Sequence, residues 1–182
     1  MMPAPVLIFA VGNESRGDDA TGPLLLRRLD VWLKSGGSAD YFEPIEDFQL
    51  QIEHAMDMKD RQLVLFIDAG MDTPSPFAFY RAHIDDEPVL YSHALSPEAL
   101  LKVYTQFYGE VPPDAYVLCV SGASFELGTA PSLPAQTNLS AALEFAMQLL
   151  SKPDALLWDR LCTQKRVAIR SAQTSDQLSP DL

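Results

Sequence analysis

The sequence predicts an α/β fold: a three-layer α/β/α sandwich with a mostly parallel sheet of about five strands. Two apolar runs, residues 6–11 and 63–69, are continuous rather than alternating, which is typical of strands buried on both faces of a sheet. Segments with helical periodicity lie between the apolar runs. This alternation favours parallel strands joined by crossover helices.

The elements follow one another along the chain in that alternating order. Strands are expected near residues 5–11, 39–44, 63–69, 77–82 and 115–121, and helices near 20–34, 50–58, 97–108 and 139–150. The helix near 97–108 has the clearest start, because Ser96 is a suitable N-cap and Pro97 suits the first helical position. Pro153 is expected to open one further short helix.

The length of 182 residues is expected to form one domain over residues 1–150. Residues 151–182 are expected to add a C-terminal helix and a tail. The last twelve residues, 171–182, are polar and have no periodicity, so we expect this tail to be disordered.

The charge and composition of the chain limit the kinds of partner that it is expected to bind. A formal net charge of -12 argues against binding to nucleic acid or to an anionic membrane, and it favours a basic partner surface. No apolar stretch approaches the length of a membrane span, and the first residues lack the basic start of a signal peptide, so a cytoplasmic protein is expected. Cys119 and Cys162 form neither a metal-binding spacing nor a disulfide framework, and Cys119 is expected in the core.

The most informative segment follows the first apolar run. Gly12 and Asn13 supply a turn, and Asp18 and Asp19 stand where a helix must begin. Capping of that helix explains one aspartate. A phosphate-binding loop is excluded by the two negative charges and the missing Lys-Ser/Thr, and glycines at 12, 17 and 22 lack dinucleotide-binding spacing. Cation binding is the remaining alternative, and it requires further ligands.

Two further residues can supply those ligands. Asp68 ends the second buried run, where an unpaired carboxylate is costly. His93 lies in the loop before the helix that begins after Ser96. Asp19, Asp68 and His93 together offer two oxygen donors and one nitrogen donor, a set that suits Ni, Zn, Fe or Mn and differs from the thiolate ligands of a structural zinc site.

Other candidate residues carry less information. No Gly-x-Ser-x-Gly nucleophile motif is present. His54 and His83 are expected to be surface residues, and Glu14 and Arg16 are expected in a solvated loop.

Four motifs stand out along the chain. The first is Gly12-Asn13-x-x-x-Gly17-Asp18-Asp19-x-x-Gly22, and the second is Phe48-Gln49-Leu50 with Glu53, followed by Phe66-Ile67-Asp68-Ala69. The third is Ser92-His93-Ala94-Leu95, and the fourth is the strand through Val117–Val120 with Ser124-Phe125-Glu126-x-Gly128 and Leu139-Ser140. In this order and spacing, which covers roughly residues 5 to 150, the chain resembles the hydrogenase maturation endopeptidases, which remove the C-terminal extension of the large subunit of nickel–iron hydrogenases.

The resemblance implies that Asp19, Asp68 and His93 are the metal ligands, and that nickel is recognised in the large-subunit precursor. We expect these three residues to form the catalytic centre, with Asp18 a candidate general base. Zn or Cd is expected to substitute for nickel, because three ligands leave the site open. A monomer is expected. Many members have Glu where this chain has Asp19, and the segment from Thr129 to Asn138 looks longer than usual. A metal-dependent hydrolase of a small substrate and a non-catalytic relative that binds nickel or a partner stay open as alternatives.

Overall fold

The fold is built around one five-stranded sheet. The computed structural model describes residues 3–84 and 95–162. The strand order is β2-β1-β3-β5-β4; β2, β1, β3 and β5 are parallel, and β4 is antiparallel at one edge. The strands are β1 (Val6–Val11), β2 (Phe42–Asp47), β3 (Leu63–Gly70), β4 (Phe77–Arg81) and β5 (Asp114–Ser121).

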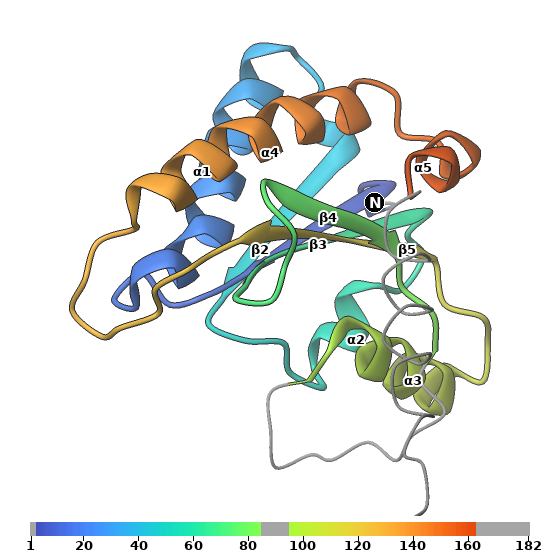
Figure 1. The fold of residues 1–182 in the computed structure, drawn as a ribbon. Helices are drawn as coiled ribbons and strands as arrows, with labels where there is room; N and C mark the ends of the chain where they lie inside the picture. Colours follow the sequence, from blue (N-terminus) through green and yellow to red (C-terminus); the bar gives the residue numbers. More distant parts are fainter. Residues whose placement is uncertain (1–2, 85–94, 163–182) are drawn as a thin grey trace, which may run out of the picture.

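Helices cover both faces of this sheet, so the predicted three-layer α/β fold is confirmed (Figure 1). On one face lie α1 (Thr21–Ser35), α4 (Leu133–Ser151) and α5 (Ala155–Leu161); on the other lie α2 (His54–Asp57) and α3 (Pro97–Tyr108). Two short 3-10 helices, η1 (Gly17–Ala20) and η2 (Ala39–Tyr41), precede α1 and β2.

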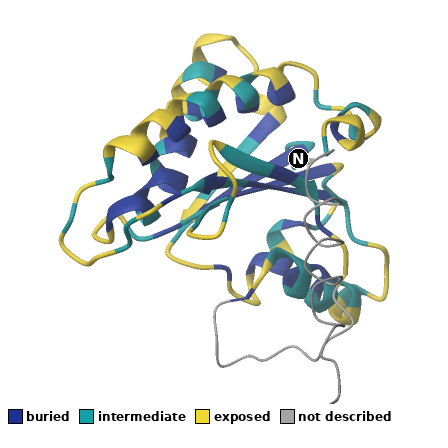
Figure 2. Cartoon of the chain, in the orientation of Figure 1, coloured by how far each residue is buried: buried dark blue, intermediate teal, exposed yellow. Residues whose placement is uncertain are grey.

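The sheet separates two apolar cores, and the continuous apolar runs supply both. In β1, Val6 and Ile8 pack toward α1 and α4, whereas Leu7 and Phe9 pack toward α2 and α3, and none of the four is more than 1% exposed. Figure 2 shows the resulting pattern, with buried residues along the sheet and exposed ones on the outer sides of the helices.

The short helix α5 is held against the sheet edge by aromatic packing and hydrogen bonds. Trp158 is fully buried, and its indole N–H donates to the Leu149 carbonyl at 3.2 Å. Asp159 accepts hydrogen bonds from Arg81 at 2.8 Å and from the Tyr116 hydroxyl at 2.9 Å. Residues 151–162 therefore pack on the same core as the rest of the chain.

Four predicted boundaries differ from the structure. β2 begins at Phe42 rather than near residue 39, because residues 39–41 form a 3-10 turn. The helix predicted near 50–58 is reduced to the four residues of α2. The helix predicted from residue 139 begins at Leu133, because Ser132 caps it by accepting from the Ala135 N–H. The last helix begins at Ala155 rather than at Pro153, because Asp154 caps it by accepting from the Leu157 N–H.

Within the part of the chain that the structure describes, no helix is both long enough and apolar enough to cross a membrane.

Candidate functional site

Asp19 and Asp68 lie at the same edge of the sheet, where the parallel strands β1 and β3 end. Asp19 is in η1, which follows the loop after β1, and Asp68 is near the carboxyl end of β3. Side chains alternate along a strand, so Asp68 faces the same side of the sheet as Val64 and Phe66, toward α2 and α3. This edge is the usual ligand-binding position in open α/β sheets.

The carboxyl group of Asp68 has a raised pKa. Burial raises its pKa to about 6; the 2.7 Å hydrogen bond from the Ala69 N–H opposes this, and the negative charge of Asp19 adds to it. The effect of Asp19 means that the two carboxylates are close enough to repel each other. The structure thus brings together two of the three residues predicted as metal ligands.

The loop after β1 orients the Asp19 side chain. The Asn13 N–H donates to Asp19 Oδ2 at 2.9 Å, and Asn13 Oδ1 accepts from the Ser15 N–H at 2.9 Å. Gly12 has a φ of +147°, and a Cβ there would lie 2.1 Å from the Asp19 carbonyl oxygen. Only glycine permits this close approach, which explains why the motif begins with Gly12-Asn13.

Asp18 is completely buried beside this site, and it does not face open solvent. Its carboxylate accepts hydrogen bonds from the N–H groups of Ala123 at 2.7 Å, Ser124 at 3.0 Å and Ser132 at 2.6 Å, and from the Ser132 hydroxyl at 2.9 Å. Burial alone would raise the pKa of Asp18, but these hydrogen bonds outweigh it and lower the pKa. Asp18 is therefore an ionised acceptor that is fully engaged in hydrogen bonds.

Asp18 belongs to a wider junction between two loops. We call residues 12–20 the first-motif loop and residues 122–132 the β5–α4 loop. Backbone hydrogen bonds join them from Gly17 N to Thr129 O, from Asp18 N to Ser124 O and from Gly128 N to Ser15 O, at 3.1, 2.8 and 2.6 Å. Gly17, with a φ of +54°, allows the contact, because a Cβ there would lie 2.5 Å from the Ser124 carbonyl oxygen.

This junction gives the fourth sequence motif a structural role that the sequence did not reveal. Ser124 and Gly128 each bond to the first-motif loop, although more than one hundred residues separate Ser124 from Asp18. Neither spacing nor periodicity signals a contact over that distance. From the sequence alone, only the joint occurrence of the first and fourth motifs suggested that they belong to one site.

The third predicted ligand, His93, falls outside the described residues, as do Ser92 and Ala94. Within residues 3–84 and 95–162, no group of three His, Cys, Asp or Glu side chains is arranged to hold a metal ion. In the same ranges, no basic side chain forms an ion pair with Asp19 or Asp68. Two neighbouring acidic groups without a basic partner there fit the donor chemistry of a cation site.

A hollow of about 360 Å³ lies beside the first-motif loop, between that loop and the end of β2. Asn13, Glu14, Asp47 and Phe48 are among the residues that line it, and Phe48 is 72% exposed. Glu14 is exposed, as expected, but Arg27 binds it through two hydrogen bonds, which lower its pKa. The hollow offers acidic and aromatic surface close to Asp19.

The prediction that His54 is a surface residue is wrong; His83 is exposed, as predicted. His54 is 8% exposed, and its ring packs 5.1 Å from that of Phe9. Its Nδ1 accepts from the Gln51 N–H at 3.0 Å, and its Nε2 lies 3.4 Å from Asp47 Oδ2. His54 thus fixes the loop that follows β2, one wall of the hollow.

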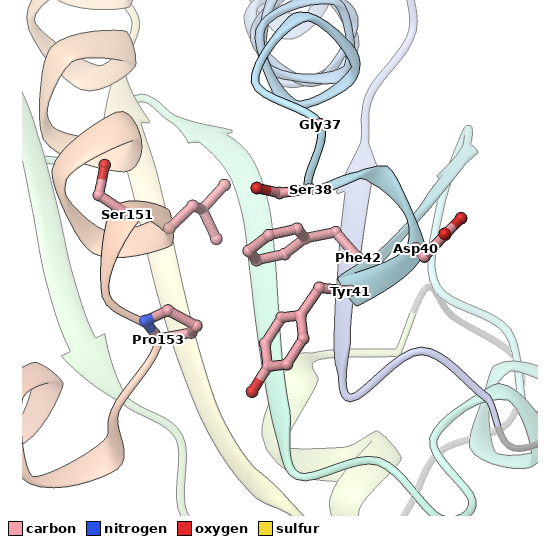
Figure 3. Close-up of a pocket in the computed structure, with 8 residues that line it drawn as sticks. Gly37, Ser38, Asp40, Tyr41, Phe42, Ser151 and Pro153 are labelled. Carbon is pink, nitrogen blue, oxygen red and sulfur yellow. The ribbon is translucent and has the colours of Figure 1, made fainter.

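A larger hollow, of about 510 Å³, lies far from Asp19 and Asp68. It is bounded by Tyr41 and Phe42 on one side and by Ser151 and Pro153 on the other (Figure 3). Phe42 begins β2, so this hollow is at the amino end of the parallel strands, opposite the candidate site. The larger hollow is therefore not part of the site formed by Asp19 and Asp68.

Cys119 is next to Asp68 in the sheet, because the two residues are paired in the register of β3 and β5. Its sulfur lies 3.0 Å from the Thr73 hydroxyl oxygen, and the side chain packs partly buried against the core on the α2 and α3 side. The predicted core placement is thus confirmed only in part, at the margin of the core.

Comparison with protein-family models finds no match, and comparison with curated proteins finds none either. Solved structures do match. A NiFe hydrogenase maturation protease HycI from Thermococcus kodakarensis KOD1 has a TM-score of 0.61 and 21% identity, and the match covers 82% of this chain and 94% of that one.

Two Escherichia coli structures agree. The hydrogenase maturating endopeptidase HybD has a TM-score of 0.60 and 23% identity over 80% of this chain and 91% of its own. A structure described as an endopeptidase has a TM-score of 0.58 and 24% identity over the same shares. An uncharacterised protein from Wolinella succinogenes also matches, at a TM-score of 0.53 and 16% identity. The chain therefore has the fold of the NiFe hydrogenase maturation proteases.

Proposed function

We propose that this protein is an endopeptidase that removes the C-terminal extension of a nickel–iron hydrogenase large-subunit precursor after nickel insertion. The observation that carries the proposal is the convergence of Asp19 and Asp68 at the carboxyl edge of the sheet, where the charge of one raises the pKa of the other. The fold adds support, since solved structures named as hydrogenase maturation proteases share it over about four-fifths of the chain.

The donor chemistry is consistent with recognition of a metal that the substrate carries. Two carboxylates and an imidazole from His93 form an open set of three ligands, and borderline metals such as Ni²⁺ and Zn²⁺ accept oxygen and nitrogen donors. In this proposal nickel belongs to the precursor, and Asp19, Asp68 and His93 fill its free positions. Cd²⁺ or Zn²⁺ is expected to substitute in the isolated protein.

Backbone N–H groups among the described residues hold the two carboxylate ligands in place. The Asn13 N–H orients Asp19, and the Ala69 N–H fixes Asp68. A metal bound there would polarise a carbonyl or lower the pKa of a water molecule. Four hydrogen bonds engage the Asp18 carboxylate, so we assign it a holding role rather than that of the general base.

The partner and the location follow from the same proposal. A large-subunit precursor offers a polypeptide substrate, and the formal charge of -12 favours a partner with a basic contact surface. We propose that the reaction takes place in the cytoplasm and that the enzyme is a monomer.

A hydrolase of a small substrate is the second candidate, because a hollow of about 360 Å³ lies within the usual volume of small-molecule sites. Such an enzyme would cleave a small ester or amide without a protein partner. It would also be expected to keep a stoichiometric metal through treatment with a chelator.

Incubation with a precursor tests the main proposal. Mass spectrometry should show loss of the C-terminal extension with the wild-type protein and an intact precursor with Asp19→Asn. Asp30→Asn is a matched control, because Asp30 pairs with Lys34 on the surface of α1, away from the site. Full processing by Asp19→Asn would contradict the proposal, and loss of processing in both variants would point to a general defect.

A further inference from the structure

We infer that Asp18 is a positioning residue: it joins the first-motif loop to the β5–α4 loop and thereby fixes the direction of the Asp19 carboxylate. The catalytic meaning of this inference rests on the proposed function, but the coupling itself is a property of the fold. Three observations carry it, namely the hydrogen bonds to Asp18, the short turn that links Asp18 to Asp19, and the steric contacts around both.

The hydrogen bonds show where Asp18 is anchored. Its Oδ2 accepts from Ala123, Ser124 and the Ser132 hydroxyl, and its Oδ1 accepts from the Ser132 N–H. Three of these four donors are backbone amides, whose positions depend on the path of the β5–α4 loop rather than on a side-chain rotamer. Bonds from N–H groups to a carboxylate are stronger than neutral ones, so the loop path and the Asp18 position are fixed together.

The link from Asp18 to Asp19 is short and rigid. Both residues lie in η1, where the Asp19 N–H bonds to the Arg16 carbonyl at 3.1 Å and the Thr21 hydroxyl donates to the Asp18 carbonyl at 2.7 Å. On its other side, Asp19 is held by the Asn13 N–H. A shift of Asp18 is therefore passed to the adjacent residue, because no flexible segment separates them.

Steric contacts leave little room for adjustment. A Cβ at Gly122 would lie 2.9 Å from the Asp18 Cβ and 2.8 Å from the Phe125 ring, so the β5–α4 loop packs directly on Asp18. Ligands in metal sites depend on such supporting groups, and loss of one typically weakens metal binding 10- to 100-fold.

The first test removes the charge of Asp18. In metal-free Asp18→Asn, hydrogen exchange is measured by NMR under conditions in which the amides of β1 stay protected, so that global unfolding does not contribute. Exchange should be at least tenfold faster at the Ala123 and Ser124 amides, and also at the Asn13 amide, which reports on the Asp19 carboxylate. Co²⁺ binding, followed by its visible absorption, should weaken at least tenfold. Asp154→Asn is the control: it makes the same chemical change at the N-cap of α5, far from the site, and should leave the Asn13 amide and the Co²⁺ affinity unchanged.

The outcomes separate the inference from the proposed function. Unchanged exchange at Asn13 in Asp18→Asn, with faster exchange at Ala123 and Ser124, would overturn the coupling. A wild-type protein that cuts no precursor would overturn the proposed function, while the Asn13 amide would still decide the inference.

A second pair of variants covers the case in which Asp18→Asn fails to fold. Gly122→Ala keeps the charge and pushes a methyl group against Asp18, whereas Gly36→Ala adds a methyl group that meets nothing closer than 3.6 Å. Faster exchange at Asn13 is expected in Gly122→Ala alone. Wild-type exchange at Asn13 in Gly122→Ala would overturn the inference.

Discussion

Ser132 donates both its backbone N–H and its hydroxyl to the carboxylate of Asp18, at 2.6 and 2.9 Å, and the same hydroxyl oxygen accepts from the Ala135 N–H. One serine therefore begins α4 and holds the residue next to the candidate metal ligand Asp19. The packing of α4 and the geometry of the site are linked through this side chain.

Ser132→Ala should destabilise the protein more than Ser96→Ala. Both serines cap a helix, and loss of a cap costs about 1 kcal/mol. Ser132→Ala also removes a hydrogen bond to a buried carboxylate, which raises the expected cost to about 2–3 kcal/mol. The free energies of unfolding in urea should show this difference, and equal values would argue against the role given to Ser132.

Asp18→Asn should mainly reduce stability, whereas Asp19→Asn should mainly reduce activity. Asp18→Asn should cost about 3 kcal/mol of stability, because an amide NH₂ would face buried N–H donors. Asp19→Asn should abolish processing with little change in the melting temperature, because its side chain accepts one backbone hydrogen bond at a partly exposed position. Thermal unfolding and a processing assay measure the two effects. A stable Asp18→Asn or an active Asp19→Asn would contradict this assignment.

The contribution of Asp159 should be lost in acid. Burial by itself would raise the pKa of Asp159, but the hydrogen bonds from Arg81 and Tyr116 lower it overall, and the charge of His83 acts in the same direction. A folded pKa below the ordinary value stabilises the protein above that value, and the stabilisation is lost as the pH falls through the folded pKa. Asp159→Asn should therefore flatten the dependence of the unfolding free energy on pH below about pH 4. Some acid dependence should remain in the variant, because hydrogen bonds also lower the pKa of Asp18.

Binding of Cd²⁺ to the isolated protein should depend on the predicted ligands. Asp68→Asn and His93→Ala should each weaken it at least tenfold, because each removes one donor of a set of three. His83→Ala is the matched control, since His83 is exposed and lies outside the proposed set. Isothermal titration calorimetry measures the affinities. An unchanged affinity in His93→Ala would remove that residue from the ligand set.

The residues of the candidate site could be found from sequence where a local pattern marked them. Asp68 ends a continuous apolar run, and the pattern around Gly12 and Asn13 marks the turn that delivers Asp19. Both lie at the predicted sheet edge because the carboxyl ends of parallel strands meet there.

The role of Asp18 could not be found in that way, because its acceptor bonds come from residues 105 to 114 positions further along the chain. His54 was misplaced for a related reason, since its burial depends on contact with Phe9, which lies in β1 and is distant in the sequence. The start of α4 was different. Ser132 and Pro134 repeat the local signal that marked Ser96 and Pro97, so the sequence did contain that boundary.

The dependence of cleavage on nickel tests the central claim most directly. The wild-type protein is incubated with one large-subunit precursor prepared in nickel-loaded and nickel-free forms, and the mass of the precursor is followed over time. The proposal predicts that the loaded form loses its C-terminal extension while the nickel-free form stays intact. Equal cleavage of both forms, or cleavage of neither, would contradict it.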